Sequence, residues 1–254
     1  MRPLHRLILM LFSSLSLSAV GEPLRLVSEP WAPYVYEENG ALRGLDYDTT
    51  VLVLERLGIQ AEWQLLPWKR CLSSFQQGQA DGILDIFRTA EREPQMVFHE
   101  EPLSEVELLL FHAKARPHPV ERLEDLDGLK VGVSPGYWYS NQAFRESTRF
   151  VHEPAPTHEA NFGKLMRGRI DLLVTDRRAG RFLAAQLGLA EKVEHNPLVI
   201  SRDAMYLGLR RTPALETLAA RFSAELRRFK AEPAYAALLA HYAQERSPPE
   251  RETH

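Results

Sequence analysis

Residues 78–92 read Gly78-Gln79-Ala80-Asp81-Gly82-Ile83-Leu84-Asp85-Ile86-Phe87-Arg88-Thr89-Ala90-Glu91-Arg92. Gly78 closes a predicted helix, the apolar run from Ile83 to Ile86 predicts a buried strand, and Arg92 follows the end of that strand. Ligands of open α/β sheets bind outside the carboxyl ends of the strands. A guanidinium there can donate two parallel hydrogen bonds to a carboxylate. We therefore expect Arg92 in a binding cleft; the alternative is an ordinary surface arginine.

The segments before this stretch repeat the strand–helix pattern. Residues 24–28 and 60–66 read as strands, and helices that end at Gly58 and Gly78 follow them. Strand, helix, strand, helix, strand is typical of a parallel sheet with right-handed crossovers. The N-terminal half therefore predicts an α/β lobe.

Residues 113–119 interrupt the pattern, because they are rich in proline and charge and show no apolar periodicity. The βα pattern then restarts, with strands over 130–133 and 170–175 and helices over 137–146, 157–167 and 177–187. Strands over 193–200 and 204–209 lead back to helices over 213–230 and 235–243 and a charged tail. We predict two α/β lobes joined by a hinge, each a mainly parallel sheet flanked by helices. Lobe 1 comprises 22–112 and 201–254, and lobe 2 comprises 113–200.

The N-terminus has the order of a secretory signal peptide. Arg2 and Arg6 precede an apolar run over 7–17, and small residues at Ala19 and Gly21 suit a signal peptidase. The apolar run is too short for a membrane span. We expect cleavage after Gly21 and a soluble periplasmic chain.

Composition excludes several classes of function. The net charge of −3 becomes about −5 once the two leader arginines are removed, and no basic stripe suits nucleic acid. The nine histidines and one cysteine include no pair at metal-ligand spacing, so we expect no metal. No phosphate-binding glycine loop or nucleophile elbow occurs. We expect no cofactor, a small-molecule ligand and a monomer, with Cys71 buried.

Loops that follow predicted strands carry residues that could bind a ligand. They bring together aromatic side chains, one cation and two carboxylates, which would suit a zwitterion if the lobes face each other. The alternative for Asp176 is the N-cap of the helix over 177–187. The candidate ligand-binding residues are Trp31, Tyr34, Trp68, Asp85, Phe87, Arg92, Tyr137, Trp138 and Asp176.

These motifs, in this order, resemble the bacterial extracellular solute-binding proteins of family 3, the amino-acid type of periplasmic binding protein. The resemblance covers the whole mature chain. It rests on Trp31-x-Pro33-Tyr34, Gly44-x-Asp46-x-Asp48, Gly78-x-x-Asp81, Thr89-x-x-Arg92, the Leu126–Val133 motif, and Gly168-Arg169-x-Asp171 followed by Asp176.

The resemblance implies a protein that closes on a ligand and presents it to an inner-membrane ABC permease. It implies that Arg92 holds an α-carboxylate, that Asp176 holds an α-ammonium, and that Trp31 and Trp68 form aromatic walls. Asp85 and Phe87 stand where the family keeps small hydroxyl residues, and the Tyr137-Trp138 pair replaces another hydroxyl pair, which indicates a bulkier pocket. Two alternatives use the same scaffold: a periplasmic dehydratase with Asp85 as its acid, and a ligand sensor for a receptor.

Overall fold

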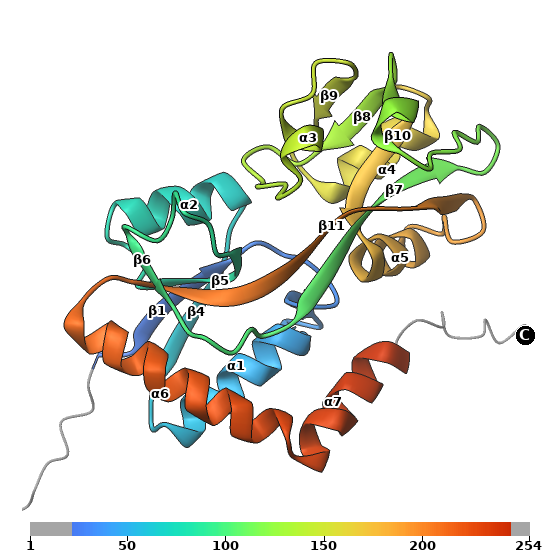
Figure 1. Cartoon of the computed structure of the whole chain (residues 1–254). Coiled ribbons are helices and arrows are strands. Elements are labelled where there is room, and N and C mark those ends of the chain that lie inside the picture. Colours follow the sequence, from blue (N-terminus) through green and yellow to red (C-terminus); the bar gives the residue numbers. More distant parts are fainter. Residues whose placement is uncertain (1–21, 245–254) are drawn as a thin grey trace, which may run out of the picture.

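Two lobes joined by two strands make up the computed structural model, which describes residues 22–244 (Figure 1). The predicted signal peptide and the tail beyond residue 244 lie outside the described residues. The strands follow the order β4-β1-β5-β11-β7-β10-β8-β9, and β6 pairs with β11. Because β11 and β7 stand in the middle, one hydrogen-bonded path connects both lobes. Within 22–244, no helix has the length and apolar character needed to cross a membrane.

The first lobe combines the N-terminal strands with the C-terminal helices. β1 pairs in parallel with β4 and with β5, and successive residues of β5 supply two cores. Ile83 packs under α2, whereas Leu84 packs on the other face with α1 and α6. Its elements are β1 (Leu24–Ser28), β2 (Tyr36–Glu38), β3 (Ala41–Arg43), α1 (Leu45–Arg56), β4 (Ala61–Leu65), α2 (Trp68–Gln76), β5 (Gly82–Phe87), β6 (Met96–Phe98), α6 (Pro213–Lys230) and α7 (Pro233–Gln244).

The second lobe is smaller and is also built on two faces of a sheet. β8 pairs in parallel with β9 and with β10, and β10 pairs antiparallel with β7. Leu108 and Leu110 of β7 pack on one face, and Leu109 and Phe111 pack on the other. Its elements are β7 (Glu105–Ala113), η1 (Leu123–Leu126), β8 (Lys130–Val133), α3 (Gln142–Arg145), β9 (Val151–Pro154), α4 (His158–Met166), β10 (Leu172–Asp176) and α5 (Arg177–Gln186).

The strand β11 (Val193–Arg210) passes from the second lobe to the first as one continuous strand of 18 residues. It pairs with β7 as far as Ala204 and with β5 from Met205 onward. The sequence pattern predicts two separate strands here, over 193–200 and 204–209. The expected lobe boundary at residue 113 falls at the end of β7, although Leu108 already packs in the second core. The strands β7 and β11 are therefore themselves the connection between the lobes.

The loop after β8 differs most from the sequence prediction. A helix was expected over 137–146, but α3 begins only at Gln142, where the side chain of Asn141 accepts from Phe144 N. Residues 137–141 remain irregular because the Tyr137 side chain contacts the first lobe. The hairpin β2–β3 around the turn at Gly40 and the strand β9 were not predicted as elements. Cys71 is buried, as expected.

Candidate functional site

A cavity lies between the lobes, and seven of the nine predicted site residues line it. Its volume is about 30 Å³, which is room for only a few water molecules. A ligand of amino-acid size therefore enters only when the lobes, or Tyr137, move apart. The lining residues are Ser28, Glu29, Trp31, Trp68, Asp85, Phe87, Arg92, Tyr137, Trp138 and Met205.

The loop after β1 brings Trp31 to the cavity. Trp31 N donates to Val35 O, and Tyr34 N donates back to Trp31 O, so the chain turns tightly here. Gly44 supports this turn from behind, because a Cβ atom at that position would lie 2.2 Å from Tyr34 O. The indole Nε1 of Trp31 is buried and has no hydrogen-bond partner among residues 22–244. The loop therefore delivers an unused donor to the cleft.

Asp85 lies in β5 but has the left-handed backbone conformation, with φ 58°. The pairing of β5 with β11 shifts register at this place, between Tyr206 and Gly208. Such a bulge turns a side chain away from the regular alternation of a strand. Asp85 is only 8% exposed, and no donor within 22–244 reaches either carboxyl oxygen.

A second buried carboxyl group, that of Asp46, lies next to Asp85. The two side chains are within hydrogen-bonding reach of each other. Burial raises the pKa of both groups, and the nearby Asp46 raises the pKa of Asp85 further, well above its usual range. Asp46 Oδ2 also accepts a hydrogen bond of 2.5 Å from the Ser104 hydroxyl, a donor that stabilises its anion and that Asp85 lacks.

Arg92 follows β5 in a turn that Thr89 closes: Arg92 N donates to Thr89 O at 3.0 Å. Its Nη1 donates to Phe87 O at 2.8 Å, and its guanidinium carbon lies 5.7 Å from the ring centre of Trp68. No carboxylate within 22–244 forms an ion pair with it, and burial lowers the pKa of the guanidinium. Arg92 is thus a partly desolvated cation with donors to spare.

The second lobe closes the cavity with the irregular loop after β8. Trp68 Nε1 donates to Gly136 O at 3.0 Å, and the Tyr137 hydroxyl donates to Glu29. The Tyr137 oxygen also lies 3.0 Å from His158 Nε2. Burial raises the pKa of Glu29 and lowers that of His158. The contacts of Trp68 with Gly136 and of Tyr137 with Glu29 join the two lobes directly across the site.

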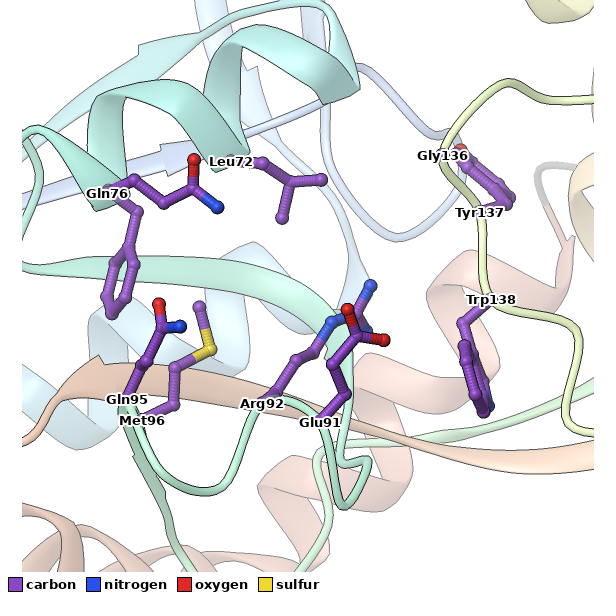
Figure 2. A pocket seen from close by; sticks show the side chains of 10 residues that line it. Leu72, Gln76, Glu91, Arg92, Gln95, Met96, Gly136, Tyr137 and Trp138 are labelled. Carbon is purple, nitrogen blue, oxygen red and sulfur yellow. The ribbon is translucent and has the colours of Figure 1, made fainter.

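A second hollow continues outward from the cavity and shares Arg92, Tyr137 and Trp138 with it. Figure 2 shows α2 on one side of this outer chamber and the Gly136–Trp138 loop on the other, with Arg92 between them. The chamber has a volume of about 230 Å³. Leu72, Phe75 and Met96 give it an apolar wall, whereas Gln76, Glu91 and Gln95 give it a polar one.

Tyr34 and Asp176 do not line the cavity; their side chains form a hydrogen bond with each other. The Tyr34 hydroxyl donates to Asp176 Oδ1 at 2.9 Å, which is a contact between lobes. The same oxygen caps α5 by accepting from Arg178 N and Ala179 N, and Oδ2 accepts from Glu107 N. The structure therefore places Asp176 in the N-cap position, and its ligand-binding role stays a prediction.

A family model described as bacterial extracellular solute-binding proteins, family 3, matches residues 24–245. The chain belongs to this family. The two-lobed α/β fold predicted from the sequence is confirmed, since solved structures of amino-acid-binding proteins have a similar fold.

The relatives of this family 3 protein are distant in sequence. The probable amino-acid-binding protein YxeM of Bacillus subtilis (strain 168) is 21% identical over 174 residues, which cover 68% of this chain and 66% of YxeM, just under two thirds. The structure of AbpA from Streptococcus pneumoniae, an amino acid ABC transporter substrate-binding protein bound to L-arginine, has a TM-score of 0.76 at 17% identity and covers 88% of this chain and 95% of AbpA.

Two further solved structures have similar folds. A histidine kinase sensor domain has a TM-score of 0.75 at 22% identity, covering 87% of this chain and 96% of its own. The ancestral amino-acid-binding protein AncCDT-1, a precursor of cyclohexadienyl dehydratase, has a TM-score of 0.73 at 20% identity. The match covers 87% of this chain and 95% of AncCDT-1. At these identities, the likeness establishes the fold alone.

Sequence reasoning missed three cavity residues of this family 3 protein: Ser28, Glu29 and Met205. Ser28 ends the predicted strand over 24–28 and Glu29 follows it directly, so the strand-end rule that selected Trp31 would have selected both. Met205 carried no signal, because its place depends on β11 running unbroken through the hinge. Within 22–244, no group of three or more metal-ligating side chains is found.

Proposed function

We propose that this protein is a periplasmic solute-binding protein that captures an amino acid, or a related zwitterion or carboxylate, and delivers it to an inner-membrane ABC importer. Family membership supports ligand binding. The description of AbpA as an ABC transporter protein supports delivery to an importer. We expect the protein to act as a monomer and to release its ligand unchanged.

The observation that carries this proposal is the set of polar groups around one cavity that have unused hydrogen-bonding or ion-pairing capacity. Arg92 has no ion pair within 22–244, both carboxyl oxygens of Asp85 lack a donor, and the Trp31 indole lacks an acceptor. Each unsatisfied buried group costs about 1–3 kcal/mol. A small ligand with a carboxylate at one end and donors at the other would satisfy these groups together.

Hinge closure is the mechanism that this arrangement supports. The groups that would hold the ligand come from both lobes, with Arg92 on the first and Tyr137 on the second. A ligand that contacts both lobes stabilises the closed population by its differential affinity for it. Bending of β7 and β11 would open the cavity, since they connect the lobes.

A thermal-shift screen against amino acids, polyamines, small carboxylates and short peptides tests the proposal. We expect carboxylate-bearing compounds to raise the melting temperature, and Arg92→Ala to abolish that rise. Loss of two charge-assisted hydrogen bonds of about 1.5–3 kcal/mol each weakens binding by at least about 100-fold. Arg88→Ala is the matched control, because Arg88 is exposed and pairs with Glu93.

An unchanged shift in Arg92→Ala would remove Arg92 from the site, and a screen in which no carboxylate binds would overturn the ligand class. Mass spectrometry of a bound compound after incubation should recover it intact; a dehydrated product would favour an enzyme. Deleting the gene should reduce uptake of that compound. Unchanged uptake with a lost transcriptional response would indicate a sensor.

A further inference from the structure

We propose that Asp85, held against Asp46, receives the positively charged nitrogen of the ligand, and that the ligand displaces a proton that the two carboxyl groups share. This inference rests on the proposed function, in which Arg92 holds the carboxylate end. It assigns the cation to a different residue from the Asp176 that the family resemblance indicates.

The position of Asp85 suits a ligand contact. The side chain is more than nine-tenths buried, lines the cavity, and has no donor within 22–244 for either oxygen. Its left-handed conformation is unusual for a residue with a side chain, and such conformations cluster at ligand sites because the surrounding fold must stabilise them. Asn39, the other non-glycine residue with positive φ among those described, sits in a hairpin turn.

Asp46 explains how an unpartnered carboxyl group is tolerated there. Two adjacent buried carboxyl groups cannot both ionise at low cost, so they share one proton. Asp46 lies in the first turn of α1, where the helix dipole favours an anion, and Ser104 donates to it. The proton therefore resides on Asp85, which donates it to Asp46.

The charged groups around the pair also favour the proton on Asp85 and the negative charge on Asp46. Lys230 of α6 and Arg178 of α5 both act on Asp46 and stabilise its charge. Tyr137 of the second lobe lines the same cavity as Asp85, and no cation within 22–244 forms an ion pair with Asp85. A positively charged ligand group would be the first cation to reach Asp85.

The other acidic groups near the cleft are already engaged. Asp176 accepts four hydrogen bonds and does not line the cavity. Glu29 accepts from the Tyr137 hydroxyl and from Trp68 N. Asp85 alone among the three has both oxygens without a donor in the part of the chain that the structure describes.

The exchange is balanced in atoms and charge. The ligand ammonium and the neutral Asp85 carboxyl group become an ammonium–carboxylate pair, and one proton leaves to solvent. Binding should therefore release up to one proton per ligand below the pKa of the pair. Affinity for an ammonium ligand should rise by up to about tenfold per pH unit in that range, because the proton and the cation compete for one carboxylate.

The first experiment needs no ligand. In the mature protein labelled with ¹³C at the aspartate carboxyl groups, we expect the Asp85 signal to be that of a neutral acid at pH 7 and the Asp46 signal that of an anion. Asp85→Asn should remove the neutral signal. If both carboxyl groups of the pair ionise below pH 5, the shared proton does not exist and the inference fails.

The second experiment uses the twenty L-amino acids and their α-hydroxy or desamino analogues as probes in calorimetry at pH 7. For each amino acid that binds, the heat should differ between phosphate and Tris buffers by one proton released, and the analogues without nitrogen should bind at least tenfold more weakly. Asp85→Asn should weaken amino-acid binding at least tenfold and remove the buffer dependence. Asp127→Asn, an exposed control, should do neither.

The two proposals fail separately. Binding that needs Arg92 but is unaffected by Asp85→Asn, or identical heats in both buffers, overturns the inference and leaves the proposed function standing. If no amino acid or analogue binds, the proposed ligand class fails, and the carboxyl signals of the ligand-free protein still decide whether the pair shares a proton.

Discussion

The hydroxyl group of Tyr34 donates to Asp176 Oδ1 across the boundary between the lobes, at 2.9 Å. Both residues are almost fully buried, so this hydrogen bond is shielded from water. It lies beside the cavity and not in it. It therefore joins the two closed lobes through the protein's own side chains.

Replacing Tyr34 by phenylalanine should lower stability with little effect on the ligand site. Asp176 keeps its three backbone donors, so the loss is one net hydrogen bond of about 1 kcal/mol. The melting temperature should fall by a few degrees. Tyr47→Phe is the control, because Tyr47 is partly exposed on α1; equal losses in both variants would contradict the assigned role.

Arg92→Lys should distinguish the contribution of the positive charge to ligand binding from that of the forked guanidinium geometry. Lysine keeps the positive charge but cannot donate two parallel hydrogen bonds to a carboxylate. We expect about tenfold weaker binding in calorimetry, intermediate between the native protein and Arg92→Ala. Equal losses in the lysine and alanine variants would show that only the fork geometry matters.

The buried His99 should make stability depend on pH. Its Nε2 accepts from Leu207 N at 2.9 Å, so its Nδ1 carries the hydrogen and donates to Glu101 O. Burial lowers its pKa to about 4, against about 6.5 in the unfolded chain. The unfolded state therefore takes up the proton first as the pH falls below 6.5.

The free energy of unfolding should therefore fall by about 3 kcal/mol as the pH is lowered, and the fall is complete only below pH 4. This magnitude follows because the pKa of His99 differs by about 2.5 between the folded and unfolded states, and each pKa unit corresponds to 1.36 kcal/mol. Urea denaturation at pH 7, 5.5 and 4.5 measures it. His99→Gln should be less stable at pH 7, but its free energy of unfolding should change less between pH 7 and 4.5. A native slope in His99→Gln would contradict the prediction.

Gly44→Ala should disturb both stability and binding. The added Cβ would lie 2.2 Å from Tyr34 O, at a residue with φ 136°, so the loop that carries Trp31 must shift. We expect a loss of about 3 kcal/mol or more in chemical denaturation, and weaker ligand binding. Gly40→Ala has positive φ but open space around it and should cost only about 1 kcal/mol.

Much of this fold was predictable because its signals are local. The helix over 213–230 begins and ends as α6 does, since Thr212 caps it and its apolar residues repeat every three or four positions. The break at 137–141 was not predictable, because Tyr137 is held by Glu29, which is distant in sequence. The continuity of β11 likewise depends on pairing with β7 and β5, which a local pattern does not contain.

Much of the cavity lining was predictable from the sequence, but the pairing of the side chains was not. Strand ends selected Asp85 and Arg92, and both line the cavity. Asp176 was chosen for the same reason, yet Tyr34 and the first turn of α5 occupy its oxygens. Asp46 was noted only as part of a helix start, because its proximity to Asp85 arises where α1 packs on β5.

The outer chamber between α2 and Trp138 has a practical consequence. Arg92 stands where the inner cavity meets this chamber, so a compound bound head-first would be selected by its inner end while its far end extends outward. A dye or affinity tag attached at that far end should then be tolerated. Binding of such conjugates, made from a few candidate head groups, would identify the chemical class of the natural solute directly.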